Sequence, residues 1–149
     1  MVATRIGVTG HRLLAPHPGL AAAIDAALAA IELRRPAPRA LVPGFAEGAE
    51  ELVAGRALQR GWELHALLPL PAGDHAIDMK RPDDFRRLLA RAATVDTISP
   101  TLARPDCYRG QGLALVDRSD ELLAVWNGAA ARWPGGTGEI VAAARTSCH

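Results

Sequence analysis

The feature that most constrains this sequence is a regular alternation of short apolar runs with longer stretches of helical spacing. The last of the runs is almost wholly apolar, which is typical of a central strand covered on both faces. Each run is closed by glycine, proline or polar residues, as expected of strands. The predicted strands are Arg5–Thr9, Arg39–Pro43, Trp62–Leu68, Thr94–Ser99 and Glu121–Trp126.

The stretches between these runs carry apolar residues three and four positions apart, which predicts amphipathic helices. Gly61 is placed to end the second of them as a C-terminal cap. Strands that alternate with helices indicate a mostly parallel sheet with helices on both faces. We therefore predict one α/β, Rossmann-like domain over residues 1–149, with about five strands. The predicted helices are Leu20–Leu33, Gly48–Arg60, Asp83–Ala93, Gly110–Arg118 and Thr137–Arg145.

Composition excludes several classes of protein. With 49% hydrophobic residues and a net charge of +1 over 149 residues, the chain is neither disordered nor charged enough to attract nucleic acid or a membrane. Cys107 and Cys148 are too far apart in sequence to suggest a zinc site or a disulfide framework. The first residues do not predict a signal peptide, and no apolar run reaches the roughly 18 residues expected of a transmembrane helix. We expect a cytoplasmic protein without a metal or cofactor.

Three loops that follow predicted strands are rich in glycine and polar residues. Ligands of open parallel sheets bind beyond the carboxyl ends of the strands, so these loops should open onto one site. The loops are Thr9–Gly10–His11–Arg12, the segment from Gly44 to Glu50, and the segment from Asn127–Gly128 to Glu139.

The last loop and the first loop offer groups for a phosphate. Gly135–Gly136–Thr137 leads into a helix, whose free amides and positive end favour an anion, although an ordinary loop with a threonine cap has the same pattern. Arg12 could hold a phosphate through its planar fork, or be a solvated surface arginine. His11 could donate to a ligand or pack against the next loop.

The second loop suits a ribose better than a phosphate. Its glycines, Gly44 and Gly48, open a helix, but carboxylates in that first turn would repel an anion. Glu47 could bind ribose hydroxyls or polarise a leaving base. Glu50 and Glu51 are equally well explained as an acidic start to the helix.

A nucleobase could stack on Tyr108, the only tyrosine of a chain with 4% aromatic residues. It is predicted to lie in a polar loop beside Arg109, where a ring and a guanidinium could face one base. Trp126 could form a wall of the same pocket. Asn127, with Gly128, could contact the ligand or only make a turn.

These motifs, in this order, resemble the SLOG superfamily of Rossmann-like nucleotide-binding domains, which includes the Lonely Guy phosphoribohydrolases and the DNA-processing protein DprA. The resemblance covers essentially the whole chain. It implies a nucleotide or nucleotide-derived ligand, held by the residues named above. The segments that carry it are Ile6–Arg12, Gly44–Glu50, Leu67–Pro69, Ser119–Gly128 and Gly135–Thr137.

The sequence departs from the Lonely Guy enzymes where their resemblance would imply catalysis. Glu139 stands where their motif has threonine, and Ala142 stands where it has the catalytic glutamate. The leading interpretation is therefore a nucleotide-binding protein, with ligand sensing as a further expectation. The alternative is an N-glycosidase that releases the base from a nucleoside 5′-monophosphate, with Glu47 or Glu139 stabilising the charge that develops on the ribose and Arg12 holding the phosphate.

The partner expected from the sequence is a nucleotide-like small molecule. A near-zero net charge and a single lysine make DNA a poor fit. SLOG relatives continue into another strand after the last helix, so either the sheet lacks an edge strand or a partner subunit covers that edge, and we expect a homodimer.

Overall fold

The computed structural model describes residues 3–10, 19–45, 48–77, 80–98, 104–125 and 137–146. They form a five-stranded sheet in the order β4-β3-β2-β1-β5, in which every pair of neighbours is parallel. This confirms the predicted α/β architecture. The strands are β1 (Thr4–Gly10), β2 (Arg39–Val42), β3 (Glu63–Leu68), β4 (Thr94–Thr97) and β5 (Glu121–Val125).

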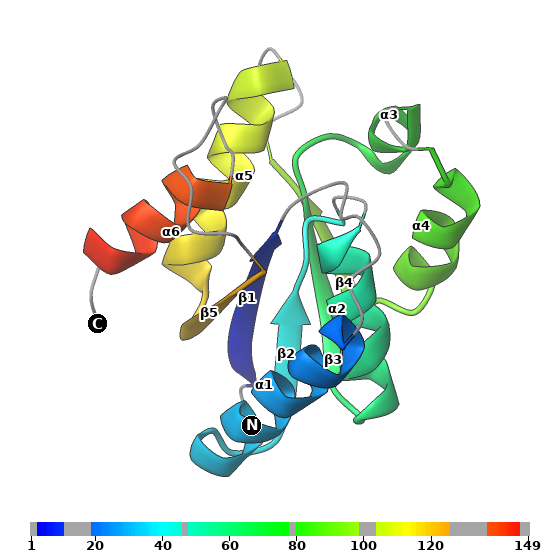
Figure 1. Cartoon of the computed structure of the whole chain (residues 1–149). Helices are drawn as coiled ribbons and strands as arrows, with labels where there is room; N and C mark the ends of the chain where they lie inside the picture. Colours follow the sequence, from blue (N-terminus) through cyan, green and yellow to red (C-terminus); the bar gives the residue numbers. More distant parts are fainter. Residues whose placement is uncertain are drawn as a thin grey trace.

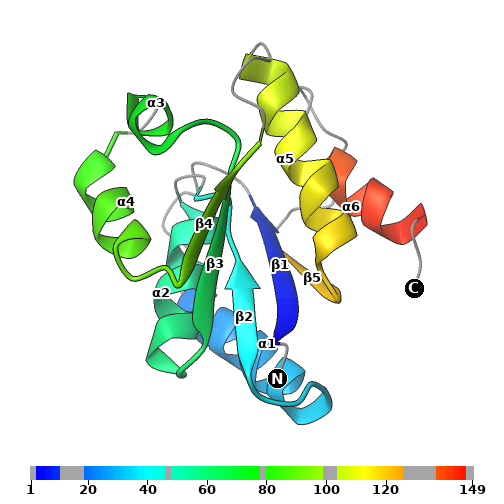
Figure 2. The same ribbon diagram turned by 180° about the vertical axis from the view of Figure 1, so that it is seen from behind.

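Helices cover both faces of the sheet (Figures 1 and 2). One face carries α1 and α2, with α4 beside α2, and the other carries α5 and α6. None of the described helices is long and apolar enough to cross a membrane. The helices are α1 (Leu20–Arg34), α2 (Ala49–Gln59), α3 (Ala72–Ile77), α4 (Pro82–Leu89), α5 (Arg104–Arg118) and α6 (Thr137–Thr146).

The pleat of β1 divides the core between the two faces. Ile6 and Val8 are fully buried in the larger cluster, together with Leu28 of α1 and Val53 of α2. Gly7 faces the other way, where a Cβ atom would lie 2.4 Å from Ser119 Oγ on the segment that follows α5. The glycine therefore lets the second helical layer approach the sheet closely.

The prediction that Glu121–Trp126 is a central strand is wrong. β5 pairs with β1 alone among the described strands and lies at an edge of the sheet. Its side chains nevertheless reach both cores, because Leu123 packs on the α1–α2 side and Leu122 on the α5 side. An apolar run indicates that both faces of a strand are covered by helices, and this does not require a neighbouring strand on each side.

Three helices differ from the prediction. α4 ends at Leu89 instead of Ala93. α3 was missed because it is six residues long and follows a proline-rich segment. α5 begins at Arg104 instead of Gly110, so the segment around Tyr108 is helical and the predicted polar loop is wrong there. The prediction began this helix at Gly110 because the preceding segment is polar and shows no apolar face in the sequence.

Gly61 ends α2 as predicted. It has a φ of +83°, and its amide donates to the Leu58 carbonyl at 3.0 Å. The next amide, of Trp62, donates to the Ala57 carbonyl at 3.0 Å. This pair of bonds is the Schellman motif, which turns the chain from α2 directly into β3.

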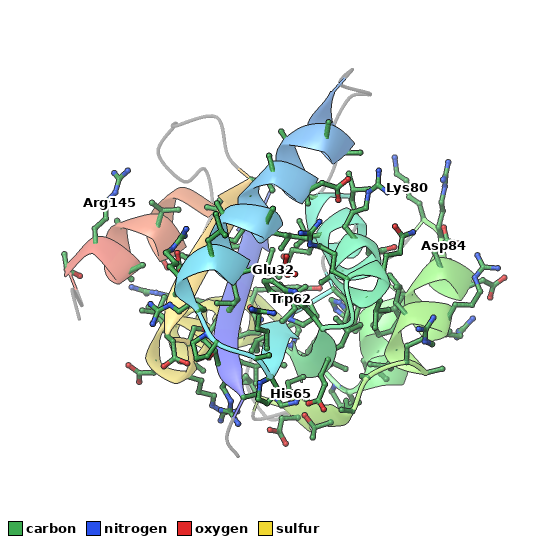
Figure 3. The ribbon with its side chains drawn as sticks, turned by 90° about the horizontal axis from the view of Figure 1, so that it is seen from below. Glu32, Trp62, His65, Lys80, Asp84 and Arg145 are labelled. Atoms are coloured by element: carbon green, nitrogen blue, oxygen red, sulfur yellow. The ribbon has the colours of Figure 1, made fainter. Side chains whose placement is uncertain are left out.

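Polar bonds also tie α1 to its neighbours. Glu32 accepts hydrogen bonds from Trp62 Nε1 at 2.9 Å and from Arg60 Nε at 3.1 Å, and Figure 3 shows Glu32 and Trp62 side by side. These two donors lower the pKa of Glu32 to about 2. The carboxylate therefore stays charged and fastens α1 to the turn that enters β3.

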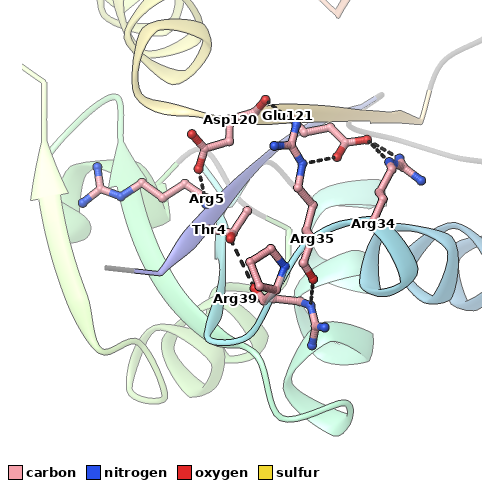
Figure 4. Close-up of polar contacts among 8 residues, drawn as sticks. Thr4, Arg5, Arg34, Arg35, Arg39, Asp120 and Glu121 are labelled. Carbon is pink, nitrogen blue, oxygen red and sulfur yellow. Dashed lines mark hydrogen bonds and ion pairs between the residues drawn. The ribbon is translucent and has the colours of Figure 1, made fainter. Parts of the chain in front are cut away.

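The amino ends of the strands, here called the amino edge of the sheet, are joined to the end of α1 by ion pairs (Figure 4). Glu121 pairs with Arg34 and, at 3.1 Å, with Arg35, while Asp120 accepts the Arg5 amide at 2.9 Å. Burial raises the pKa of Glu121, but the hydrogen bonds from the two arginines outweigh it and leave the pKa below its usual value. These contacts hold edge strand β5 against the end of α1.

Candidate functional site

The carboxyl ends of the parallel strands form the other end of the sheet, here called the carboxyl edge. The ends of β1 and β5 lie side by side there. In the register of the sheet, Thr9 pairs with Ala124 and Gly10 pairs with Val125. The loops that follow these two strands therefore leave from adjacent points. Thr9 is buried, with 8% of its surface exposed, so its predicted role in binding would fall to its backbone or to a hydroxyl at the pocket floor.

Gly10 brings the start of α2 to the same place. A Cβ atom there would lie 2.7 Å from the Cβ of Ala49, the first residue of α2, and 3.2 Å from that of Val125. Only glycine allows this approach. Gly48, the N-cap of α2, has a φ of +96°, which also requires glycine.

Gly44, which follows β2, is held by two other elements. Its amide donates to Glu50 Oε1 at 2.9 Å, and Glu50 is buried with 7% exposed. A Cβ atom on Gly44 would lie 2.5 Å from Gln111 Nε2 on α5. Of the two explanations for Glu50, the structure therefore favours the structural one.

Gln111 is a site-bordering residue that the sequence analysis missed. Its amide donates to the carbonyl of Leu67, at the end of β3, at 3.0 Å. This bond places α5 across the carboxyl ends of β2 and β3. A lone glutamine in a polar segment gives no sequence signal for such a role.

Tyr108 lies one turn before Gln111, and residues three apart share a helix face. Its half-buried ring is tilted against the ring of His75, with centroids 6.1 Å apart. The tyrosine is thus connected to the β2–α2 loop through His75, whose Nε2 lies 3.1 Å from the carbonyl oxygen of Phe45, and it comes from a helix instead of the predicted loop.

The first turn of α6 packs on the same part of α5. Gly112 lets Ile140 approach, since a Cβ atom there would lie 2.2 Å from Ile140 Cδ1. Glu139 is ion-paired with Arg109 at 3.1 Å, and Thr137, the first residue of α6, is buried. Because Glu139 already has a cationic partner, it is a weaker candidate for stabilising positive charge on a ribose.

Several predicted ligand contacts lie outside the described residues, and the structure gives no account of them. They are His11, Arg12, Glu47, Trp126, Asn127, Gly128, Gly135 and Gly136. Among the residues that are described, no group of three or more His, Cys, Asp and Glu is arranged to hold a metal ion.

A groove of about 600 Å³ lies between the first turn of α2 and α4. It mixes acidic, basic and apolar side chains, and Asp84 in it is ion-paired with Arg87. The lining residues are Glu51, Leu52, Asp84, Arg87, Leu88 and Arg91.

The architecture is similar to that of a known protein. No protein-family model matches the chain, and no curated protein matches its sequence. A crystal structure of DNA processing protein A (DprA) from Streptococcus pneumoniae superposes with a TM-score of 0.66 at 15% identity. The match covers 97% of this chain and 47% of that one, so the chain spans about half the length of its structural neighbour. The chain thus has a DprA-like, Rossmann-like fold, as the resemblance to the SLOG superfamily implied.

Proposed function

We propose that the protein binds a nucleotide or a nucleotide derivative at the carboxyl edge of its sheet. The observation that carries the proposal is the convergence of α2 and α5 at the strand ends: the start of α2 approaches Gly10 through Ala49, and α5 approaches Gly44 through Gln111. Ligands of open α/β sheets bind at this edge. The DprA-like fold is consistent with a ligand that contains a nucleotide.

In this proposal each loop takes one part of the ligand. The phosphate binds at Gly135–Gly136–Thr137 and Arg12, where amides at the start of α6 and a guanidinium favour an anion. The ribose hydroxyls bind Glu47. The base lies against Tyr108, near the β2–α2 loop.

We favour binding over cleavage because of the contact made by Glu139. Its ion pair with Arg109 engages one of the two carboxylates that base release could use. Glycosidase activity would then depend on Glu47 alone. Release of free base from a nucleoside monophosphate, lost in Glu47→Gln, would show that the site is catalytic.

A thermal-shift experiment tests the proposal. The panel holds nucleoside mono-, di- and triphosphates, ADP-ribose and cyclic nucleotides, together with a DNA oligonucleotide. A ligand at a hundredfold its Kd adds about 2.7 kcal/mol, which raises the Tm of a domain this size by about 5–10 °C. We expect Arg12→Ala to abolish the rise.

The matched control is Arg86→Ala, which removes an exposed arginine of α4 whose ion pair, within the described part of the chain, is with Asp83 in the same helix. This variant should keep the full ligand-induced rise in Tm. No rise with any nucleotide would contradict the proposal, and a rise with DNA alone would reassign the site to nucleic acid.

A further inference from the structure

Three of the chain's few aromatic rings meet around one buried histidine. Phe45 and Phe85 are the only phenylalanines and Tyr108 is the only tyrosine of the chain. His75, from α3, is fully buried, with its ring 5.2 Å from that of Phe85 and 6.1 Å from that of Tyr108. Phe45 stacks edge-on against Phe85 at 5.6 Å.

His75 also holds the backbone of the β2–α2 loop. Its Nε2 lies 3.1 Å from the carbonyl oxygen of Phe45, and a carbonyl only accepts, so Nε2 donates. Phe45 has a φ of +59°, a left-handed conformation that costs a non-glycine residue about 1 kcal/mol or more and persists only where its surroundings enforce it.

The same histidine therefore touches two parts of the site. Through the Phe45 carbonyl it fixes the loop that leads to Glu47, and through its ring it supports Tyr108. Two other side chains that contact this loop, Glu50 and Gln111, act on Gly44 instead.

We propose that His75 is a positioning residue for the base-binding side of the nucleotide site, and that this side selects ligands with an aromatic base over sugar phosphates. The inference rests on the proposed function. His75 acts through Phe45 and Tyr108 and does not itself contact the ligand. In the proposed function the phosphate is bound by other residues, Arg12 and Gly135–Gly136–Thr137, so a positioning role of His75 predicts no effect on phosphate binding.

The experiment compares the four ribonucleoside 5′-monophosphates with ribose 5-phosphate, which lacks only the base. Dissociation constants are measured calorimetrically for the wild type, His75→Leu and His75→Gln. We expect His75→Leu to weaken monophosphate binding about tenfold, the equivalent of one hydrogen bond, and to leave ribose 5-phosphate within about twofold. His75→Gln keeps an N–H donor and should restore most of the affinity.

Two further variants separate positioning from general stability. Phe85→Leu opens a cavity in the same cluster but leaves the His75–Phe45 bond, so it should lower the Tm without a base-selective loss. Tyr108→Leu should reproduce the base-selective loss, and it carries the test if His75→Leu does not fold.

Two results would overturn the inference. One is an equal loss of monophosphate and ribose 5-phosphate binding, which indicates a purely structural role, and the other is unchanged monophosphate binding in both His75→Leu and Tyr108→Leu. If the wild type binds neither class of probe, the proposed function itself fails, which is a distinct outcome.

Discussion

At the scale of single residues, several polar side chains near the candidate site make hydrogen bonds to backbone groups. Glu50 accepts the Gly44 amide, Gln111 donates to the Leu67 carbonyl, and His75 donates to the Phe45 carbonyl. A sequence shows the residue type but not its partner, so Glu50 could be assigned only as one of two alternatives. His75 and Gln111 gave no signal, because neither stands in a recognisable motif.

Glu32 offers a prediction far from the candidate site. Replacing it by Gln weakens the bonds to Trp62 and Arg60, so the free energy of unfolding at pH 7 should fall by about 1–2 kcal/mol. Denaturant unfolding measures this change. The control is Glu63→Gln, whose exposed pair with His65 should contribute almost nothing.

The same residue predicts a pH dependence. The pKa of Glu32 is lowered from 4.5 to about 2 in the folded protein, so its contribution is complete above pH 5 and is lost as the pH falls toward 2. The stability difference between wild type and Glu32→Gln should shrink over this range. A difference that stays constant from pH 6 to pH 3 would contradict the assignment.

At the scale of secondary-structure elements, glycines set how closely the layers approach. Gly7 admits the end of α5 to β1, and Gly112 admits α6 to α5. The sequence predicted the alternation of strands and helices correctly, since periodicity follows from which faces are buried. It could not predict the start of α5, because the polar segment that begins this helix shows no apolar periodicity in the sequence.

Two helical glycines give a matched test of this packing. Gly112→Ala places a Cβ 2.2 Å from Ile140 Cδ1, so it should destabilise the protein by about 1–3 kcal/mol through overpacking between α5 and α6. Gly55→Ala, inside α2 with no atom within 4 Å of the new Cβ, should stabilise it by about 0.5–1 kcal/mol. Equal effects of the same sign, measured by thermal or denaturant unfolding, would show that helix propensity decides both.

At the scale of the whole molecule, the amino and carboxyl edges of the sheet are built from different groups. The amino edge is closed by the pairs of Glu121 with Arg34 and Arg35. The carboxyl edge gathers strand ends, glycines and the start of α2. A sequence can predict this polarity once a parallel sheet is recognised, because all strands then end at one edge. It could not predict which loop Tyr108 would face, since that depends on the packing of α5.

The most direct test of the account is a map of amide chemical shifts as the most stabilising nucleotide is titrated into the labelled protein. The account predicts that the shifted amides cluster at the carboxyl edge, at Gly10, Gly44, Gly48 and Thr137, and spare Thr4 and Arg39 at the amino edge. Shifts centred on α4 and the turn after it, around Leu88 and Arg91, with Gly10, Gly44, Gly48 and Thr137 unchanged, would contradict it.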